Sequence, residues 1–306
     1  MDTYIEQLND YKKQDGKPLS QKSQSLYIRT MTKLTTENGW DLRIEHMKPY
    51  LSQFTQSHQT NYINSIMNYL SVMKYDEEII QLYRNYREEI KSTPYEMSKT
   101  KKDNCCEWSD ILRWRDHIIK QNRLIEETGI CPIHKLQTEA LLRLYTTYQR
   151  RNEYADLIFF DDSMPIPEHD NCIFYDTSKN KLYLMLGDFK TKEKYGKQIL
   201  EISDTDDNMG TKTFLLKYII QNNKNPIMFT TRALGRSKEV KQLSRLNLTK
   251  LLNRSSQEIL KKTISTDRIR KAYNTSKYKV MKEELLKDSI NNSHSPNVIL
   301  QHYTLS

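Results

Sequence analysis

The sequence predicts a mainly α-helical protein with one small antiparallel β-sheet, and three observations lead to this prediction. Apolar residues recur at intervals of three and four through most of the 306 residues, which is the spacing of one helix face. That spacing is lost between the segment LIFF at 157–160 and the segment KQILEI at 197–202. Between these segments, two apolar runs flank the turn D-T-S-K-N within residues 172–186, a pattern typical of a β-hairpin. The polar segment 93–106, with a proline and no periodicity, separates two parts of the chain.

The first part, residues 1–92, is expected to form a small helical bundle. Residues 1–20 are expected to be a loose arm, and Ser25 is expected to cap a helix that the Asn-Gly-Trp segment at 38–40 interrupts. The clearest apolar stripe lies on residues 60–74. This part contains no group of residues suited to catalysis, so we expect the chemistry to lie elsewhere in the chain.

The second part, residues 107–306, is expected to begin with a helix at Trp108 and to continue with another helix after Pro132. The predicted strands follow, and helical periodicity returns after them. We therefore predict two domains, one helical and one helical with a small sheet, joined by the linker at 93–106.

Positive charge is concentrated in one stretch of the sequence. The whole chain carries a net charge of +9, but the stretch from Arg232 to Lys287 alone has 16 Lys and Arg against 5 Asp and Glu, a net +11. The same stretch has helical periodicity, which disordered basic tails lack. Folded, clustered positive charge indicates a protein that binds the phosphate backbone of nucleic acid.

Several classes of protein are not supported by the sequence. No apolar run approaches the ~18 residues of a membrane span, and the start MDTYIEQLNDYKK does not resemble a secretory signal. The chain has 7 glycines and no Gly-rich phosphate loop ending in Lys-Ser or Lys-Thr, so nucleotide hydrolysis is not expected. The 4 cysteines lack the spacing of a disulfide framework, which favours reduced thiols and an intracellular location.

A zinc site is an alternative use of two cysteines. Cys131 stands three residues before His134, and His169 stands three residues before Cys172. Both spacings occur among zinc ligands, although cysteine and histidine also occur in such places without a metal. We expect no metal cofactor here.

Five residues suited to metal-free cleavage of a phosphodiester occur in order along the second part. Such cleavage needs a nucleophile, fixed cations that stabilise the crowded anionic phosphorane, and a general acid for the leaving oxygen. Arginine suits the phosphorane because its planar guanidinium is always charged and binds two oxygens. Lysine can act as an acid when neighbouring cations lower its pKa. The residues are Arg150, Lys190, Arg270, His294 and Tyr303.

The segments that contain these residues resemble the motifs of tyrosine recombinases, over about residues 108–306. The segment LYTTYQRRNEYADLIFFDD resembles the first arginine motif, and GDFKTKEKYGKQILEI resembles the hairpin that carries the catalytic lysine. The segment STDRIRKAYNTS resembles the second arginine motif, and SHSPNVILQHY resembles the closing motif. In the closing motif, His294 precedes Tyr303 by nine positions, as in that family.

The resemblance implies a role for each residue. Tyr303 would attack the scissile phosphate and form a 3′-phosphotyrosyl link. Arg150, Arg270 and His294 would hold the nonbridging oxygens, and Lys190 would protonate the leaving 5′-oxygen. No metal and no ATP would be required, so the expected cofactor set is empty.

Supporting residues and departures from the family pattern also follow from the motifs. Glu153 matches the acidic residue three positions after the arginine, which favours Arg150 over the adjacent Arg151 as the catalytic arginine. Asp267 stands where the family usually has a histidine and cannot donate to a phosphate in its ionised form. The glycine usual in the first motif is absent, and Tyr148 stands two residues before the arginine.

The family implies a partner and a biological setting. The partner is double-stranded DNA, held between the two domains, and strand exchange implies a homotetramer on paired sites. Integration of a virus or mobile element, in the nucleus or cytoplasm of a host, is the expected use. The alternatives are a relaxing enzyme similar to type IB topoisomerases, and a DNA-binding protein that has lost its catalytic activity.

Overall fold

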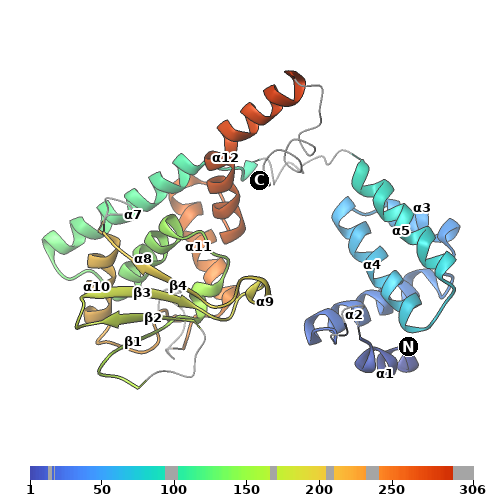
Figure 1. The fold of residues 1–306 in the computed structure, drawn as a ribbon, viewed down its shortest axis with the longest axis horizontal. Helices are drawn as coiled ribbons and strands as arrows, with labels where there is room; N and C mark the ends of the chain where they lie inside the picture. Colours follow the sequence, from blue (N-terminus) through green and yellow to red (C-terminus); the bar gives the residue numbers. More distant parts are fainter. Residues whose placement is uncertain are drawn as a thin grey trace. The chain divides into compact units, whose positions relative to one another are not determined.

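The protein is described by a computed structural model that covers residues 1–12, 16, 18–93, 103–165, 171–204, 210–231 and 241–291 (Figure 1). Its internal contacts divide the chain into two compact units, Met1–Ser98 and Lys99–Ser306. The architecture is mainly helical with one small four-stranded sheet, which confirms the predicted fold class in outline.

The first unit is a bundle of helices around its own apolar core. Its helices are α1 (Asp2–Asp10), α2 (Gln21–Asn38), α3 (Ile44–Ser52), α4 (Gln56–Val72) and α5 (Glu77–Ser92). Helix α4 contacts each of the other four, because Ile63, Ile66 and Leu70 are buried on one face of it. The stripe predicted on residues 60–74 is therefore the centre of this core.

Two predictions for the start of the chain are wrong. The expected loose arm contains helix α1, whose Tyr4 and Leu8 lie four residues apart and are buried in the core of the unit. The Tyr4 hydroxyl donates to Asn68 Oδ1 on α4 at 2.7 Å. Ser20, not Ser25, caps α2, because its hydroxyl accepts a hydrogen bond from the Ser23 N–H at 3.2 Å.

The sheet of the second unit has the order β1-β2-β3-β4. Its strands are β1 (Ile158–Asp161), β2 (Asn171–Asp176), β3 (Lys181–Leu186) and β4 (Gln198–Ile202). The predicted hairpin is confirmed as the antiparallel pair β2–β3, and β4 continues it in antiparallel register. The sheet is mixed rather than purely antiparallel, since β1 pairs with β2 in parallel.

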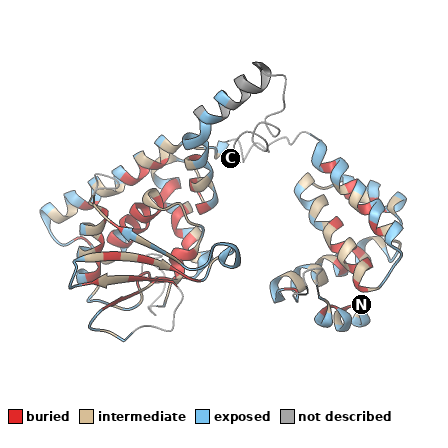
Figure 2. Ribbon diagram, in the orientation of Figure 1, coloured by how far each residue is buried: buried red, intermediate tan, exposed pale blue. Residues whose placement is uncertain are grey.

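Helix α8 is the centre of the second unit. Among the described residues of the unit, the other helices are α7 (Trp108–Thr128), α9 (Lys192–Tyr195), α10 (Thr211–Gln221), α11 (Arg245–Leu260) and α12 (Thr266–Asn291). Helix α8 (Ile133–Thr147) is buried at every position from 136 to 145, as its red ribbon in Figure 2 shows. A helix buried on all sides serves as a rigid base for the chain that follows it.

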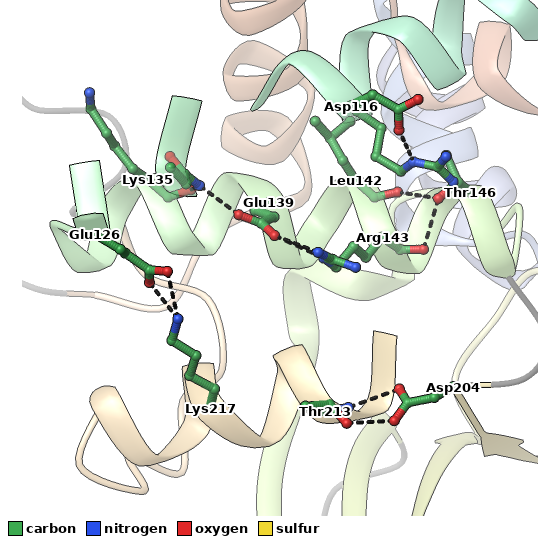
Figure 3. A network of polar contacts seen from close by, with 12 residues as sticks. Asp116, Glu126, Lys135, Glu139, Leu142, Arg143, Thr146, Asp204, Thr213 and Lys217 are labelled. Carbon is green, nitrogen blue, oxygen red and sulfur yellow. Dashed lines mark hydrogen bonds and ion pairs between the residues drawn. The ribbon is translucent and has the colours of Figure 1, made fainter. Parts of the chain in front are cut away.

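A buried ion pair on α8 helps to fix this helix among its neighbours (Figure 3). Arg143 donates to Glu139 from Nε at 2.9 Å, and less than a tenth of either side chain is exposed. Asn122 on α7 donates to the second oxygen of Glu139 at 2.8 Å. The Arg143 guanidinium also lies 4.6 Å from the ring centroid of Phe214 on α10. Helix α8 is thereby joined to helices on two sides.

Within the ranges that the structure describes, no helix combines the length and the apolar character that crossing a membrane requires.

Candidate active site

The turn after α8 carries the first candidate arginine. Helix α8 ends at Thr147, and a 3-10 helix, η1 (Glu153–Asp156), begins six residues later. Two buried tyrosines hold the backbone between them. The Tyr145 hydroxyl donates to the carbonyl of Arg151 at 2.6 Å, and the Tyr154 hydroxyl donates to the carbonyl of Tyr148 at 2.6 Å. Arg150 therefore lies on a turn with a fixed backbone.

The surroundings distinguish Arg150 from Arg151. Arg150 is half-buried, whereas Arg151 is exposed. Burial raises the pKa of the Tyr154 phenol well above its usual value, and the positive charge of Arg150 opposes this shift. Glu153 is 7% exposed, and its Oε2 has no hydrogen-bond partner within the described part of the chain. Arg150, rather than Arg151, belongs to this buried polar environment.

Side-chain hydrogen bonds join this turn to the start of α12, the helix that carries Arg270. Asn152 accepts from the Thr266 hydroxyl at 2.7 Å, and its amide donates to Thr249 Oγ1 on α11 at 3.2 Å. Arg270 follows Thr266 by one helical turn and is 28% exposed. The two candidate arginines, 120 positions apart in sequence, thus belong to directly bonded elements.

Asp267 lies on the same turn of α12 but is exposed. Its carboxylate pairs with Lys271 at 3.0 Å and stands 3.9 Å from Arg270 Nη1. This geometry suits a residue that orients neighbouring cations, and its ionised form has no hydrogen to donate to a phosphate.

Lys190 lies in the connection between β3 and β4, as predicted, and is exposed. The start of this connection is held by the buried Asn171 on β2. The Asn171 side chain accepts from the backbone N–H of Asp188 at 2.9 Å and donates to the Asp188 carbonyl at 2.9 Å. Phe189, which directly precedes Lys190, packs against the core of the unit. Lys190 therefore follows an anchored segment of backbone.

Arg245, at the first position of α11, joins this connection to η1. Its Nε donates to Asp156 Oδ2 at 2.6 Å, and its Nη2 donates to Asp188 Oδ2 at 2.8 Å. Asp156 closes η1, and Asp188 stands two residues before Lys190. One guanidinium thus links the element after Arg150 to the loop that carries Lys190.

The structure therefore brings together the elements that carry three of the predicted site residues, Arg150, Lys190 and Arg270. The other two, His294 and Tyr303, lie outside the residues that the structure describes. The sequence did not indicate Asn152, Asn171 or Arg245. Asn152 lies within the first arginine motif and Asn171 lies at the start of β2, but their side-chain partners Thr266 and Asp188 are 114 and 17 residues away in sequence.

The two cysteines of the alternative zinc pairs are both buried. Cys131 is 3% exposed and Cys172 is 2% exposed, and burial raises the pKa of the Cys131 thiol. His169 lies outside the described residues. In the part of the chain that is described, no three His, Cys, Asp or Glu side chains form a group that could hold a metal ion.

The sequence matches no protein-family profile and no curated protein at a significant level.

Proposed function

We propose that this protein is a DNA strand-transferase that cleaves and rejoins DNA through a phosphotyrosyl intermediate, as a site-specific recombinase or integrase does. The observation that carries the proposal is the bonding among η1, α11, α12 and the β3–β4 connection. The Asn152–Thr266 hydrogen bond links the turn of Arg150 to the helix of Arg270. The hydrogen bonds of Arg245 link η1 to the connection that carries Lys190. His294 and Tyr303 follow these residues in the sequence. In the proposed reaction, Tyr303 supplies the nucleophile and His294 supplies a further donor to the phosphate.

In the proposed reaction, the Tyr303 oxygen forms a bond to phosphorus and the bond from phosphorus to the 5′-oxygen breaks. The phenolic proton passes to solvent, and Lys190 gives one proton to the leaving oxygen, which departs as a 5′-hydroxyl. Arg150, Arg270 and His294 bind the nonbridging oxygens and stabilise the phosphorane. The phosphotyrosyl diester keeps the energy of the broken bond, so a 5′-hydroxyl from a partner strand can attack it and release Tyr303.

Charge supports the second unit as the DNA-binding surface. Within the basic stretch that begins at Arg232, Lys250, Lys271 and Lys279 are exposed on α11 and α12, the helices next to the proposed site. Cations in this position would contact the phosphates on both sides of the scissile bond.

Covalent capture of DNA tests the proposal. The protein is incubated with a pool of nicked duplexes of random sequence, in which the fragment released by cleavage diffuses away and traps the intermediate. An adduct that survives denaturation and contains DNA on Tyr303 is expected. Tyr303→Phe should form none, because phenylalanine has no nucleophilic oxygen, whereas Tyr278→Phe should form it normally. Specific DNA binding without any adduct would identify a catalytically silent DNA-binding protein instead.

The reaction products formed from the captured DNA sequences distinguish recombination from simple relaxation. Joined strands from two different duplexes would support strand exchange. Relaxed plasmid without exchanged products would indicate an enzyme that reseals its own strand. Exchange between two duplexes further requires a tetramer on paired sites, and sedimentation of the protein with and without cleavable DNA measures this. A monomer on paired, cleaved sites would rule the tetramer out.

A further inference from the structure

Lys190, the candidate general acid, must be held in a defined position before it can transfer a proton. A lysine side chain has four rotatable bonds, and Lys190 is exposed in the connection between β3 and β4. Proton transfer requires the Lys190 ammonium to lie within hydrogen-bond reach of the leaving oxygen, and a displacement of about 1 Å can slow a reaction by about 10²-fold. The backbone before Lys190 must therefore have a fixed relation to the arginines that hold the phosphate.

Arg245 fixes the position of the backbone before Lys190 relative to the element that follows Arg150. It donates to Asp156 at 2.6 Å on the element that follows Arg150, and to Asp188 at 2.8 Å on the segment that precedes Lys190. The two carboxylates come from η1 and from the β3–β4 connection and share one cation, so removal of Arg245 would leave two like charges facing each other. Asn171 holds the same segment through the backbone of Asp188, at 2.9 Å.

The geometry points to Arg245 as a positioning residue for Lys190, acting through the Asp156–Arg245–Asp188 bridge. This inference rests on the proposed function, since it assigns Arg245 a part in the proton transfer to the leaving oxygen. Arg245 does not itself donate to the reacting atoms. Its Nε donates to Asp156 and its Nη2 donates to Asp188, so it acts on the proton transfer through the position of Lys190.

A substrate whose leaving group needs no proton tests the inference. Replacement of the bridging 5′-oxygen by sulfur gives a thiolate leaving group, which departs without a general acid because its conjugate acid is far stronger than an alcohol. Cleavage rates are measured on a captured DNA sequence in its oxygen and sulfur forms. Arg245→Ala and Asp188→Asn are each expected to slow cleavage of the oxygen form by about 10²-fold. Both should cleave the sulfur form within a few-fold of the unsubstituted protein, as Lys190→Ala should.

Asp188→Asn keeps the test independent of folding and of DNA contact. Asp188 is exposed by 62%, so its substitution leaves the core intact, and it keeps the Arg245 cation. A matched control is Lys217→Ala, which removes an ion pair of 2.6 Å between α10 and α7 in the same unit, away from the site. The control should cleave both DNA forms at the normal rate.

The possible failures are distinct. Equal slowing on both DNA forms by Arg245→Ala and Asp188→Asn would overturn the inference and assign Arg245 a structural role only. Normal cleavage of the oxygen form by both variants would overturn it as well. Absence of any Tyr303 adduct with the unsubstituted protein would overturn the proposed function and, with it, this inference.

Discussion

The adjacent arginines on the turn after α8 (Ile133–Thr147) have different environments, and this difference gives a prediction at the scale of single residues. Arg150 is half-buried and its charge acts on the buried Tyr154 phenol, whereas Arg151 is exposed and its carbonyl accepts from Tyr145. Arg150→Ala should lower the rate of adduct formation by about 10²–10³-fold, the usual cost of losing one group that stabilises an anionic transition state. Arg151→Ala should change the rate by a few-fold at most.

The measurement is single-turnover formation of the Tyr303 adduct, with DNA affinity recorded for each variant. The opposite ranking, with Arg151→Ala the slower variant, would assign the catalytic role to Arg151. Equal loss of DNA affinity in both variants, with unchanged chemistry, would make both arginines backbone contacts.

Asp161, at the end of β1, gives a prediction for the pH dependence of stability. Its buried carboxylate accepts from the Ser163 hydroxyl and from Lys224 Nζ at 3.0 Å, and these contacts hold its pKa below the ordinary value of 3.8. A lowered folded-state pKa contributes stability that is complete above the unfolded-state pKa and is lost as pH falls through the folded-state pKa. Lys224→Ala should therefore destabilise the protein by about 1 kcal/mol near pH 7, since Lys224 is half exposed.

Urea unfolding at pH 7 and at pH 3 measures this effect. The difference between Lys224→Ala and the unsubstituted protein should shrink at the lower pH. Lys217→Ala, which removes an ion pair with the less buried Glu126, serves as a comparison. If the loss of unfolding free energy in Lys224→Ala grew toward pH 3, the ion pair with the ionised Asp161 carboxylate would not be its cause.

Single residues also show the limit of prediction from sequence. Arg150, Lys190 and Arg270 were predicted because each lies in a short motif with its own spacing. Arg245 has no such motif, since Asp156 and Asp188 lie 89 and 57 positions away, and its link to them exists only in the folded chain. Contacts between distant segments leave no periodicity in the sequence.

At the scale of elements, the buried Glu139–Arg143 pair on α8 gives a prediction about stability. Glu139→Leu removes the carboxylate that accepts from Arg143 and from Asn122 (Figure 3). Loss of one partner of a buried pair costs about 3–5 kcal/mol, because the other charge stays buried. The double variant Glu139→Leu with Arg143→Leu should be more stable than Glu139→Leu alone, although it lacks both charges.

Chemical denaturation of the single and double variants measures the two free energies of unfolding. The comparison is informative because α8 leads directly into the turn of Arg150. A double variant less stable than the Glu139→Leu variant would show that Arg143 stabilises α8 mainly through contacts other than this pair.

The elements were predicted well where a pattern repeats and poorly where it does not. The helices that begin at Trp108 and after Pro132 were predicted because their apolar residues recur over many turns. Helix α1 (Asp2–Asp10) was missed because nine residues give only two buried positions, Tyr4 and Leu8. The direction of β1 was also missed, since alternation of side chains is the same in parallel and antiparallel strands.

At the scale of the whole molecule, charge is divided unequally between the two units. Residues 1–93 contain 12 Lys and Arg and 12 Asp and Glu, whereas the stretch that begins at Arg232 has a net +11. Many cations of the first unit are paired on its own surface, as Lys91 is with Glu88 at 2.8 Å. The electrostatic part of DNA binding should therefore come from the second unit.

This division predicts which cations set the salt dependence of DNA binding. The logarithm of the affinity falls linearly with the logarithm of salt concentration, and each phosphate neutralised contributes about 0.9 to the slope. Lys279 is exposed on α12 (Thr266–Asn291) within the basic stretch, so Lys279→Ala should lower the slope by about 0.9. Lys91→Ala removes the same charge from the first unit, whose residues 1–93 have no net positive charge, and should leave the slope unchanged. The DNA affinities of both variants, measured at several salt concentrations, give the two slopes and test both expectations. An equal fall in slope for Lys91→Ala would mean that the first unit also binds the phosphate backbone, although it carries no net positive charge.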